Sequence, residues 1–123
     1  MVEDPEHPAR LVRLRAQLAA DLRGAMRARD RAATAALRSL LGAIDNAEAV
    51  TAPARSSIDP PLLGLGAAEV PRRRLDDATV NRVLYSEIAD RDGAALEYRR
   101  LERHDRADRL DAEAAVLRRY LSW

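Results

Sequence analysis

Two oppositely charged residues stand where a helical pattern calls for apolar side chains. Glu87 and Arg91 lie four residues apart in a run whose apolar positions recur every three or four residues. This spacing, with the glutamate first, is the favourable order for an ion pair on a helix. Burying an unpaired charge is costly. The pair therefore predicts either a structural ion-pair network that fixes the register of the helices, or a polar pocket open to a ligand.

Arg15 is a third charged residue inside an apolar stripe. Helical spacing places it between Leu11, Leu18 and Leu22. Two interpretations are open. The long side chain can reach past its neighbours to solvent, or the guanidinium points inward and pairs with a carboxylate on a facing helix. In the second case Arg15 can give Glu87 a second positive partner.

The residue types that usually carry catalysis form no defensible constellation. The chain has no Cys and only two His, of which His7 lies in the polar N-terminal tail. His104 and Asp105 form an HD pair without the further His and Asp ligands that such a metal site needs. Asp105, Asp108 and Asp111 spread over about 120° of a helix and alternate with arginines, which indicates a solvated face. No serine has a neighbouring His as its base. We therefore expect no catalytic residue, no metal and no cofactor.

The elements that position these residues are amphipathic helices. One stripe predicts a helix over residues 8–29, and a second predicts a helix over 31–50. Asp30 lies between them and suits an N-cap. With so short a connection, the two stripes must pack on each other as a hairpin. The stripes are Leu11, Leu14, Leu18, Leu22 and Met26, then Leu37, Leu40, Leu41 and Ile44.

A second hairpin is predicted over residues 76–121. Asp76 and Asp77 suit the positive end of a third helix, which continues to about residue 101. A turn at 102–104 then leads into a fourth helix. The apolar stripes are Val80, Val83, Leu84, Ile88, Ala94, Ala95, Tyr98 and Leu101, then Ala107, Leu110, Ala114, Leu117 and Leu121.

Residues 51–75 break the helical pattern with four prolines and two glycines. Their apolar residues predict that this loop lies over an open side of the helices. The predicted fold class is therefore all-α: two antiparallel helical hairpins, 8–50 and 76–121, form a four-helix domain with a long Pro/Gly-containing loop between them. The whole chain, 1–123, is one domain.

Composition limits the classes of protein to which the chain can belong. No apolar run approaches the roughly 20 residues that cross a bilayer, and the acidic N-terminus lacks the apolar region of a secretion signal. We therefore expect a cytoplasmic protein without membrane contact. Arginines and acidic residues number 8 and 7 in residues 1–50, 4 and 2 in 51–75, and 9 and 11 in 76–123. This balance argues against a nucleic-acid binder, which shows a basic domain or stripe.

All 21 basic residues are arginine. This usage is typical of a GC-rich genome, and the functional interpretation, phosphate recognition by bidentate forks, needs arginines that cluster without acids. The one uninterrupted basic run is Arg72, Arg73 and Arg74. It predicts either a solvated lead-in to the third helix or a contact for a phosphate or an acidic partner.

Four segments in order resemble the GatB/YqeY family. Residues 21–30, DLRGAMRARD, are similar to the family's DLKxAMKxKD segment with Arg in the Lys positions. Residues 37–48 are similar to its LRxLxxAIxNxE helix, and 87–101 to its ExI…R…A..EY segment. Residues 113–121 fit the closing E…L..YL, whereas Glu102 replaces the Gly expected in the preceding turn.

This resemblance implies a mainly helical domain related to the tail of GatB, one of the subunits of the tRNA-dependent amidotransferase. Stand-alone members carry the label of carbon–nitrogen ligase activity with glutamine as amido-N-donor. The sequence places no nucleotide or ammonia site, so we expect a non-catalytic accessory or binding module, with tRNA or a tRNA-linked protein complex as partner. We expect no second C-terminal helical domain, which stand-alone members commonly carry. The family-matching polar positions are Arg38, Asn46, Glu87, Arg91 and Arg103.

A competing hypothesis gives the chain no RNA role. A helical protein–protein interaction module, or a homodimer scaffold that uses the overhanging third helix, fits the same amphipathic pattern. Binding of labelled tRNA at two salt concentrations separates the two hypotheses, because phosphate-driven binding weakens steeply with salt.

Overall fold

The computed structural model describes residues 6–51 and 75–123, and every regular element in these two ranges is helical. The predicted all-α class is confirmed for this part of the chain. Predictions for the intervening loop, including any contact of Arg72, Arg73 and Arg74, lie outside the described residues. The elements are α1 (Glu6–Ala28), α2 (Arg31–Thr51), α4 (Asp77–Arg100), α5 (His104–Arg118) and the short 3₁₀ helix η2 (Arg119–Ser122).

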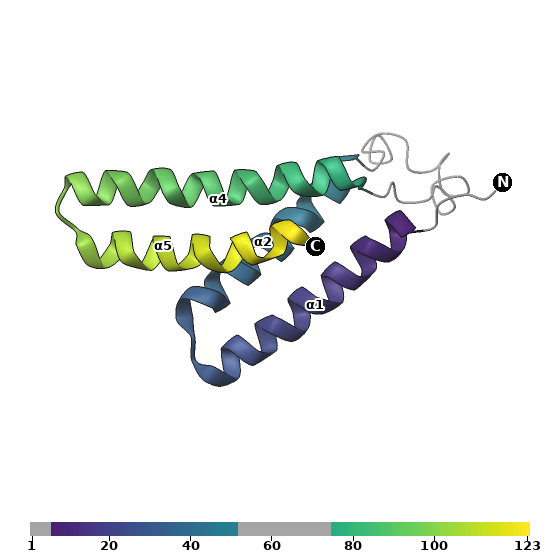
Figure 1. Cartoon of the computed structure of the whole chain (residues 1–123), viewed down its shortest axis with the longest axis horizontal. Coiled ribbons are helices and arrows are strands. Elements are labelled where there is room, and N and C mark those ends of the chain that lie inside the picture. The colour runs from purple at the N-terminus through teal and green to yellow at the C-terminus, as the bar shows by residue number, and fades with distance from the viewer. Residues whose placement is uncertain (1–5, 52–74) are drawn as a thin grey trace, which may run out of the picture.

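The helices pack in sequence-adjacent pairs, and α2 lies at the centre. Helix α1 packs against α2, α4 packs along α5, and α2 also contacts both α4 and α5. Figure 1 shows α4 and α5 side by side, with α1 diverging from α5 toward the α1–α2 turn. None of the described helices is long and apolar enough to cross a membrane.

Both turns between paired helices use the same hydrogen-bond pattern. The amide of Asp30 donates to the carbonyl of Ala25, and the amide of Arg29 donates to the carbonyl of Met26. These are the two bonds of a Schellman motif, which ends a helix with a left-handed residue. That residue is Arg29, with φ 58°. Arg29 and Asp30 are the whole connection between α1 and α2.

The α4–α5 turn repeats this motif. The amide of Arg103 donates to the carbonyl of Tyr98, and the amide of Glu102 donates to the carbonyl of Arg99. Glu102 holds the left-handed position, with φ 61°. The family resemblance leads us to expect Gly at this position, and the backbone conformation is the one that Gly adopts without strain.

Side-chain caps begin two of the helices as predicted. The Asp30 carboxylate accepts from the amide of Ala33 at 3.0 Å, and Asp76 accepts from the amide of Thr79 at 2.8 Å. The prediction that the first helix starts at Pro8 was wrong, because α1 begins at Glu6. A proline is tolerated there, since the amides of the first turn have no acceptor within the helix.

The core is aliphatic and draws on α1, α2, α4 and α5. Each large side chain removed from water contributes roughly 1.5–3 kcal/mol to folding. Two predicted stripe members are exposed: Met26 is 47% exposed and Leu101 is 66% exposed. At Met26 the buried face of α1 passes through the adjacent Ala25 instead, and Leu101 lies directly after α4. The fully buried large side chains are Leu14, Leu18, Leu37, Leu40, Ile44, Leu84 and Leu117.

Candidate functional site

Glu87 and Arg91 belong to a polar network inside the helices. The Arg91 Nη1 lies 3.0 Å from Glu87 Oε1, and its Nε donates to Glu113 Oε1 at 2.9 Å. The Ser39 hydroxyl donates to Glu87 Oε1 at 2.6 Å. We call Ser39, Glu87, Arg91 and Glu113 the buried network. It joins α2, α4 and α5.

The predicted burial of the pair is confirmed, because the side chains of Glu87, Arg91 and Glu113 are only 10–17% exposed. Each charge has an opposite partner within hydrogen-bond distance. Such a network favours the structural interpretation over the open pocket, since its donors and acceptors are directed at each other. Glu113 was not predicted as a partner, because its position shows no local pattern that links it to Arg91.

Arg15 points at carboxylates of the facing helix. It pairs with Asp45 at 2.7 Å and with the buried Glu48. The inward interpretation is therefore confirmed. The suggestion that Arg15 serves Glu87 was wrong, because both carboxylates that hold Arg15 lie on α2, near its C-terminal end.

A shallow hollow lies beside the α1–α2 turn. Its volume is about 470 Å³, and arginines dominate its lining. They come from the turn, from the first two turns of α2 and from α5, which brings residue 109 beside residues 29–38. We call it the arginine hollow; its lining residues are Met26, Arg29, Arg31, Thr34, Ala35, Arg38 and Arg109.

Among the described residues, no carboxylate lines the hollow. Within the described ranges, neither Arg29 nor Arg31 has an ion-pair partner. The Arg38 guanidinium lies 3.8 Å from the Met26 sulfur, which is a weak acceptor. Guanidinium groups left without anions in one place attract an anion with several acceptor oxygens.

Arg109 connects the arginine hollow to the buried network. Its Nε lies 3.6 Å from Glu113 Oε2, and its Nη2 donates to the Arg31 carbonyl at 3.5 Å. Glu113 and the Arg31 carbonyl therefore contact one side of the Arg109 guanidinium. This orientation limits the rotamers that Arg109 can adopt and so lowers the entropy cost of binding at its other side.

The hollow lies in a stretch of strongly basic sequence. Residues 22–44 contain five arginines and one acid, Asp30, which gives a net charge of +4. The Asp30 carboxylate is engaged in capping α2. We call residues 22–44 the basic tip. The net charge of residues 1–50 does not reveal the basic tip. The rest of that range holds six acids, at positions 3, 4, 6, 21, 45 and 48, and only three arginines.

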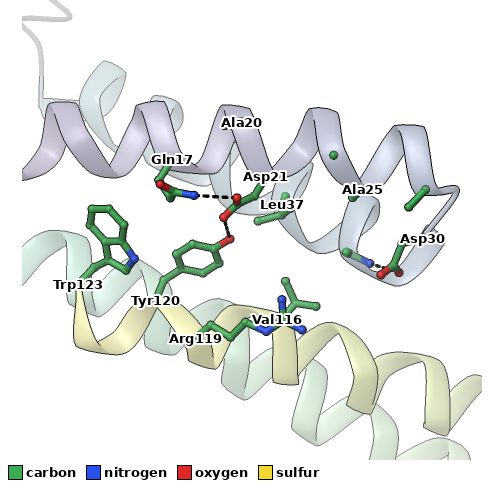
Figure 2. A pocket seen from close by; sticks show the side chains of 13 residues that line it. Gln17, Ala20, Asp21, Ala25, Asp30, Leu37, Val116, Arg119, Tyr120 and Trp123 are labelled. Carbon is green, nitrogen blue, oxygen red and sulfur yellow. Dashed lines mark hydrogen bonds between the residues drawn. The ribbon is translucent and has the colours of Figure 1, made fainter.

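A second concavity separates α1 from the end of α5. In Figure 2, Tyr120 reaches across it from η2 to Asp21 on α1, while Trp123 lies at one end. The Tyr120 hydroxyl donates to Asp21, whose other oxygen accepts from Gln17 at 2.8 Å. Burial raises the pKa of the Tyr120 phenol well above its usual range, and the bond to Asp21 acts in the same direction. We call this concavity the α1–α5 groove.

The predicted binding residues do not form one site. Glu87 and Arg91 lie together in the buried network, whereas Arg38 lines the arginine hollow. Asn46 is exposed on α2. Arg103 lies in the α4–α5 turn, beside a smaller hollow of about 350 Å³. The prediction missed Arg29, Arg31 and Arg109; the acid-poor sequence around Asp30 was the one signal for the first two.

Across residues 6–51 and 75–123, no group of three or more His, Cys, Asp or Glu side chains is arranged to hold a metal ion. Two of the aspartates of α5 form ion pairs instead: Arg99 pairs with Asp108 at 3.3 Å and also with Asp111. Comparisons of the chain with family models, curated proteins and solved structures found no match.

Proposed function

We propose that the chain is a non-catalytic accessory module of the GatB/YqeY type that binds tRNA, or a tRNA-linked complex, through its basic tip. In this proposal two antiparallel hairpins, 8–50 and 76–121, with the loop 51–75 between them, form a rigid support for the tip. The observation that carries the proposal is the net charge of +4 over residues 22–44, where Arg29 and Arg31 have no ion-pair partner among the described residues.

The distribution of charges favours binding over catalysis. A catalytic acid or base must face a substrate. In the buried network, by contrast, Glu87 and Glu113 are directed at Arg91. The basic tip has five arginines and the single acid Asp30, and its Arg29, Arg31 and Arg38 side chains are exposed. A field of one sign on one end of a small domain steers a polyanion to that end.

Titration of fluorescent tRNA at two salt concentrations tests the proposal. Contact with about four phosphates lowers the affinity roughly 100-fold between about 50 and about 200 mM salt. The double variant Arg31→Gln/Arg38→Gln removes two charges of the tip and makes this salt dependence shallower. The matched control, Arg82→Gln/Arg100→Gln, removes two exposed charges of α4 and leaves the salt dependence unchanged. Absence of binding at low salt contradicts the proposal.

The scaffold hypothesis has an observation of its own. Tyr85 and Leu96 are 58% and 59% exposed and lie three helical turns apart on α4, which puts them on one side. A homodimer through this side of α4 gives a concentration-dependent mass in analytical ultracentrifugation that Leu96→Glu abolishes. A monomeric mass at all concentrations contradicts the homodimer hypothesis. Binding of tRNA that does not depend on salt contradicts a phosphate-driven mechanism.

A further inference from the structure

The arginine hollow has more positive charge than one internal phosphate of a nucleic acid can balance. Four guanidinium groups line it, from Arg29, Arg31, Arg38 and Arg109. Glu113 offsets part of the charge of Arg109, which leaves about three positive charges against the single negative charge of a phosphodiester. A phosphomonoester carries about −1.5 to −2 at pH 7 and offers three acceptor oxygens. The charge of the hollow thus fits a terminal phosphate better than a chain of diesters.

The geometry of the lining fits the same ligand. Planar guanidinium forks bind phosphate oxygens in pairs, which a flexible ammonium cannot do. The arginines approach from three elements: the turn, α2 and α5. A group at the end of a chain can be surrounded from three directions, whereas an internal phosphate must leave two exits for the chain.

The backbone at Arg29 is a second, independent observation. Arg29 holds a left-handed conformation, φ 58°, which costs a non-glycine residue about 1 kcal/mol or more. Glycine would fill this position of the turn without that cost. The turn motif requires this conformation, since Glu102 shares it in the other turn, and at the α1–α2 turn the residue that adopts it lines the hollow. Arg109, oriented by Glu113 and by the Arg31 carbonyl, is held in place before any ligand arrives.

From these contacts we infer that the arginine hollow binds a phosphomonoester, the terminal phosphate of an RNA or of a small phosphorylated molecule. This inference rests on the proposed function in using the same surface, and it adds a preference for a chain end. Met26 and Ala35 supply an apolar wall against which the group bearing the phosphate can pack.

Calorimetry on the full chain tests the inference with two RNA hexanucleotides that differ only at the 5′ end, phosphate against hydroxyl. The phosphorylated oligonucleotide binds about 10-fold more tightly, because each charge-assisted pair of hydrogen bonds is worth about that factor. Inorganic phosphate competes with the phosphorylated oligonucleotide and removes its advantage in affinity. Arg38→Gln and Arg29→Gly each reduce the preference toward unity, whereas the control Arg100→Gln, at an exposed position of α4, keeps it. Circular dichroism confirms that each variant is folded.

The outcomes separate the inference from the proposed function. Equal affinity for the two oligonucleotides, with salt-dependent tRNA binding retained, overturns the inference and leaves the proposed function standing. Binding of inorganic phosphate that Arg38→Gln abolishes, without any tRNA binding, supports the hollow as a site for a small phosphorylated molecule and overturns the proposed function. Failure of both phosphate and the phosphorylated oligonucleotide to bind at low salt overturns the inference.

Discussion

Arg29 and Glu102 occupy the same position of the same turn motif in the two helix pairs, and they carry opposite charges. Both have a left-handed backbone, φ 58° and 61°, and in both turns the following amide reaches back to a carbonyl five residues earlier. The two positions therefore share one local strain. They differ in surroundings, because Arg29 lines the arginine hollow and Glu102 lines the smaller hollow beside Arg103.

Glycine substitutions at these two positions are expected to have the same effect on stability and different effects on tRNA binding. Arg29→Gly and Glu102→Gly each relieve the left-handed strain, partly offset by the greater entropy of the unfolded chain, and raise the free energy of unfolding by up to about 1 kcal/mol. Arg29→Gly also weakens tRNA binding, whereas Glu102→Gly leaves it intact. Urea denaturation and tRNA titration measure the two effects. Unchanged tRNA affinity in Arg29→Gly would remove Arg29 from the proposed site.

Loss of Arg91 leaves two carboxylates of the buried network without their shared partner. Arg91→Met keeps the length of the side chain and lowers the free energy of unfolding by about 3 kcal/mol or more, because Glu87 and Glu113 remain buried. The matched control is Arg100→Met, at an exposed pair with Glu97, which barely changes the melting temperature. tRNA binding by folded Arg91→Met, measured below its melting temperature, stays near that of the parent chain. Loss of binding with undiminished stability would instead support a ligand pocket at Glu87.

Asp30 stabilises the fold by capping α2, but its negative charge lowers the net positive charge of the basic tip. Asp30→Ala removes the cap on the Ala33 amide and costs about 1 kcal/mol, yet it raises the net charge of the basic tip and so tightens tRNA binding. Asp30→Asn keeps a capping oxygen and removes only the charge. Its affinity therefore rises with little loss of stability. If neither variant binds tRNA more tightly, the tip is not the contact surface.

The Tyr120 hydroxyl predicts a decline in stability at alkaline pH. An unfolded tyrosine ionises near pH 10, whereas the pKa of Tyr120 in the folded chain is higher. Above about pH 10 the unfolded state thus binds fewer protons than the folded state, and the free energy of unfolding falls as pH rises. Tyr120→Phe removes this part of the slope and also costs about 1 kcal/mol at neutral pH through the lost bond to Asp21.

Urea denaturation between pH 8 and pH 11 measures that slope. Tyr85→Phe is the control, because it removes a hydroxyl from an exposed tyrosine and keeps the decline. An identical slope in the parent chain and in Tyr120→Phe would contradict the prediction.

The sequence predicted the helices because each depends on local spacing. Leucines at intervals of three and four, with Asp30 and Asp76 at the caps, are sufficient to place α1, α2 and α4 within about two residues. The fourth helix was predicted to reach residue 121, whereas α5 ends at Arg118 and continues as the 3₁₀ helix η2. The stripes wrongly included Met26 and Leu101, which are exposed. The buried face of α1 passes through Ala25 rather than Met26, and Leu101 lies directly after α4.

The candidate site was harder to predict because its parts are distant in the chain. Arg31 and Arg109 are 78 residues apart, and only the packing of α5 on α2 brings them together. Arg38 was singled out through the family resemblance, which says nothing of its neighbours. The buried network is intermediate: the Glu87–Arg91 pair follows from spacing on one helix, whereas Ser39 and Glu113 come from two other helices.

The position of α1 beside the α1–α5 groove has a consequence for amide hydrogen exchange. Helix α1 packs mainly on α2, whereas α2 contacts α1, α4 and α5, so detaching α1 exposes less apolar surface than detaching α2. Elements of this kind open in local fluctuations below the global free energy of unfolding. The amides of α1 therefore exchange with deuterium sooner than those of α2. A phosphate in the arginine hollow contacts Arg29, directly after α1, and Arg109 on α5. It therefore ties the C-terminal end of α1 to α5 and slows the exchange of that end of α1 selectively.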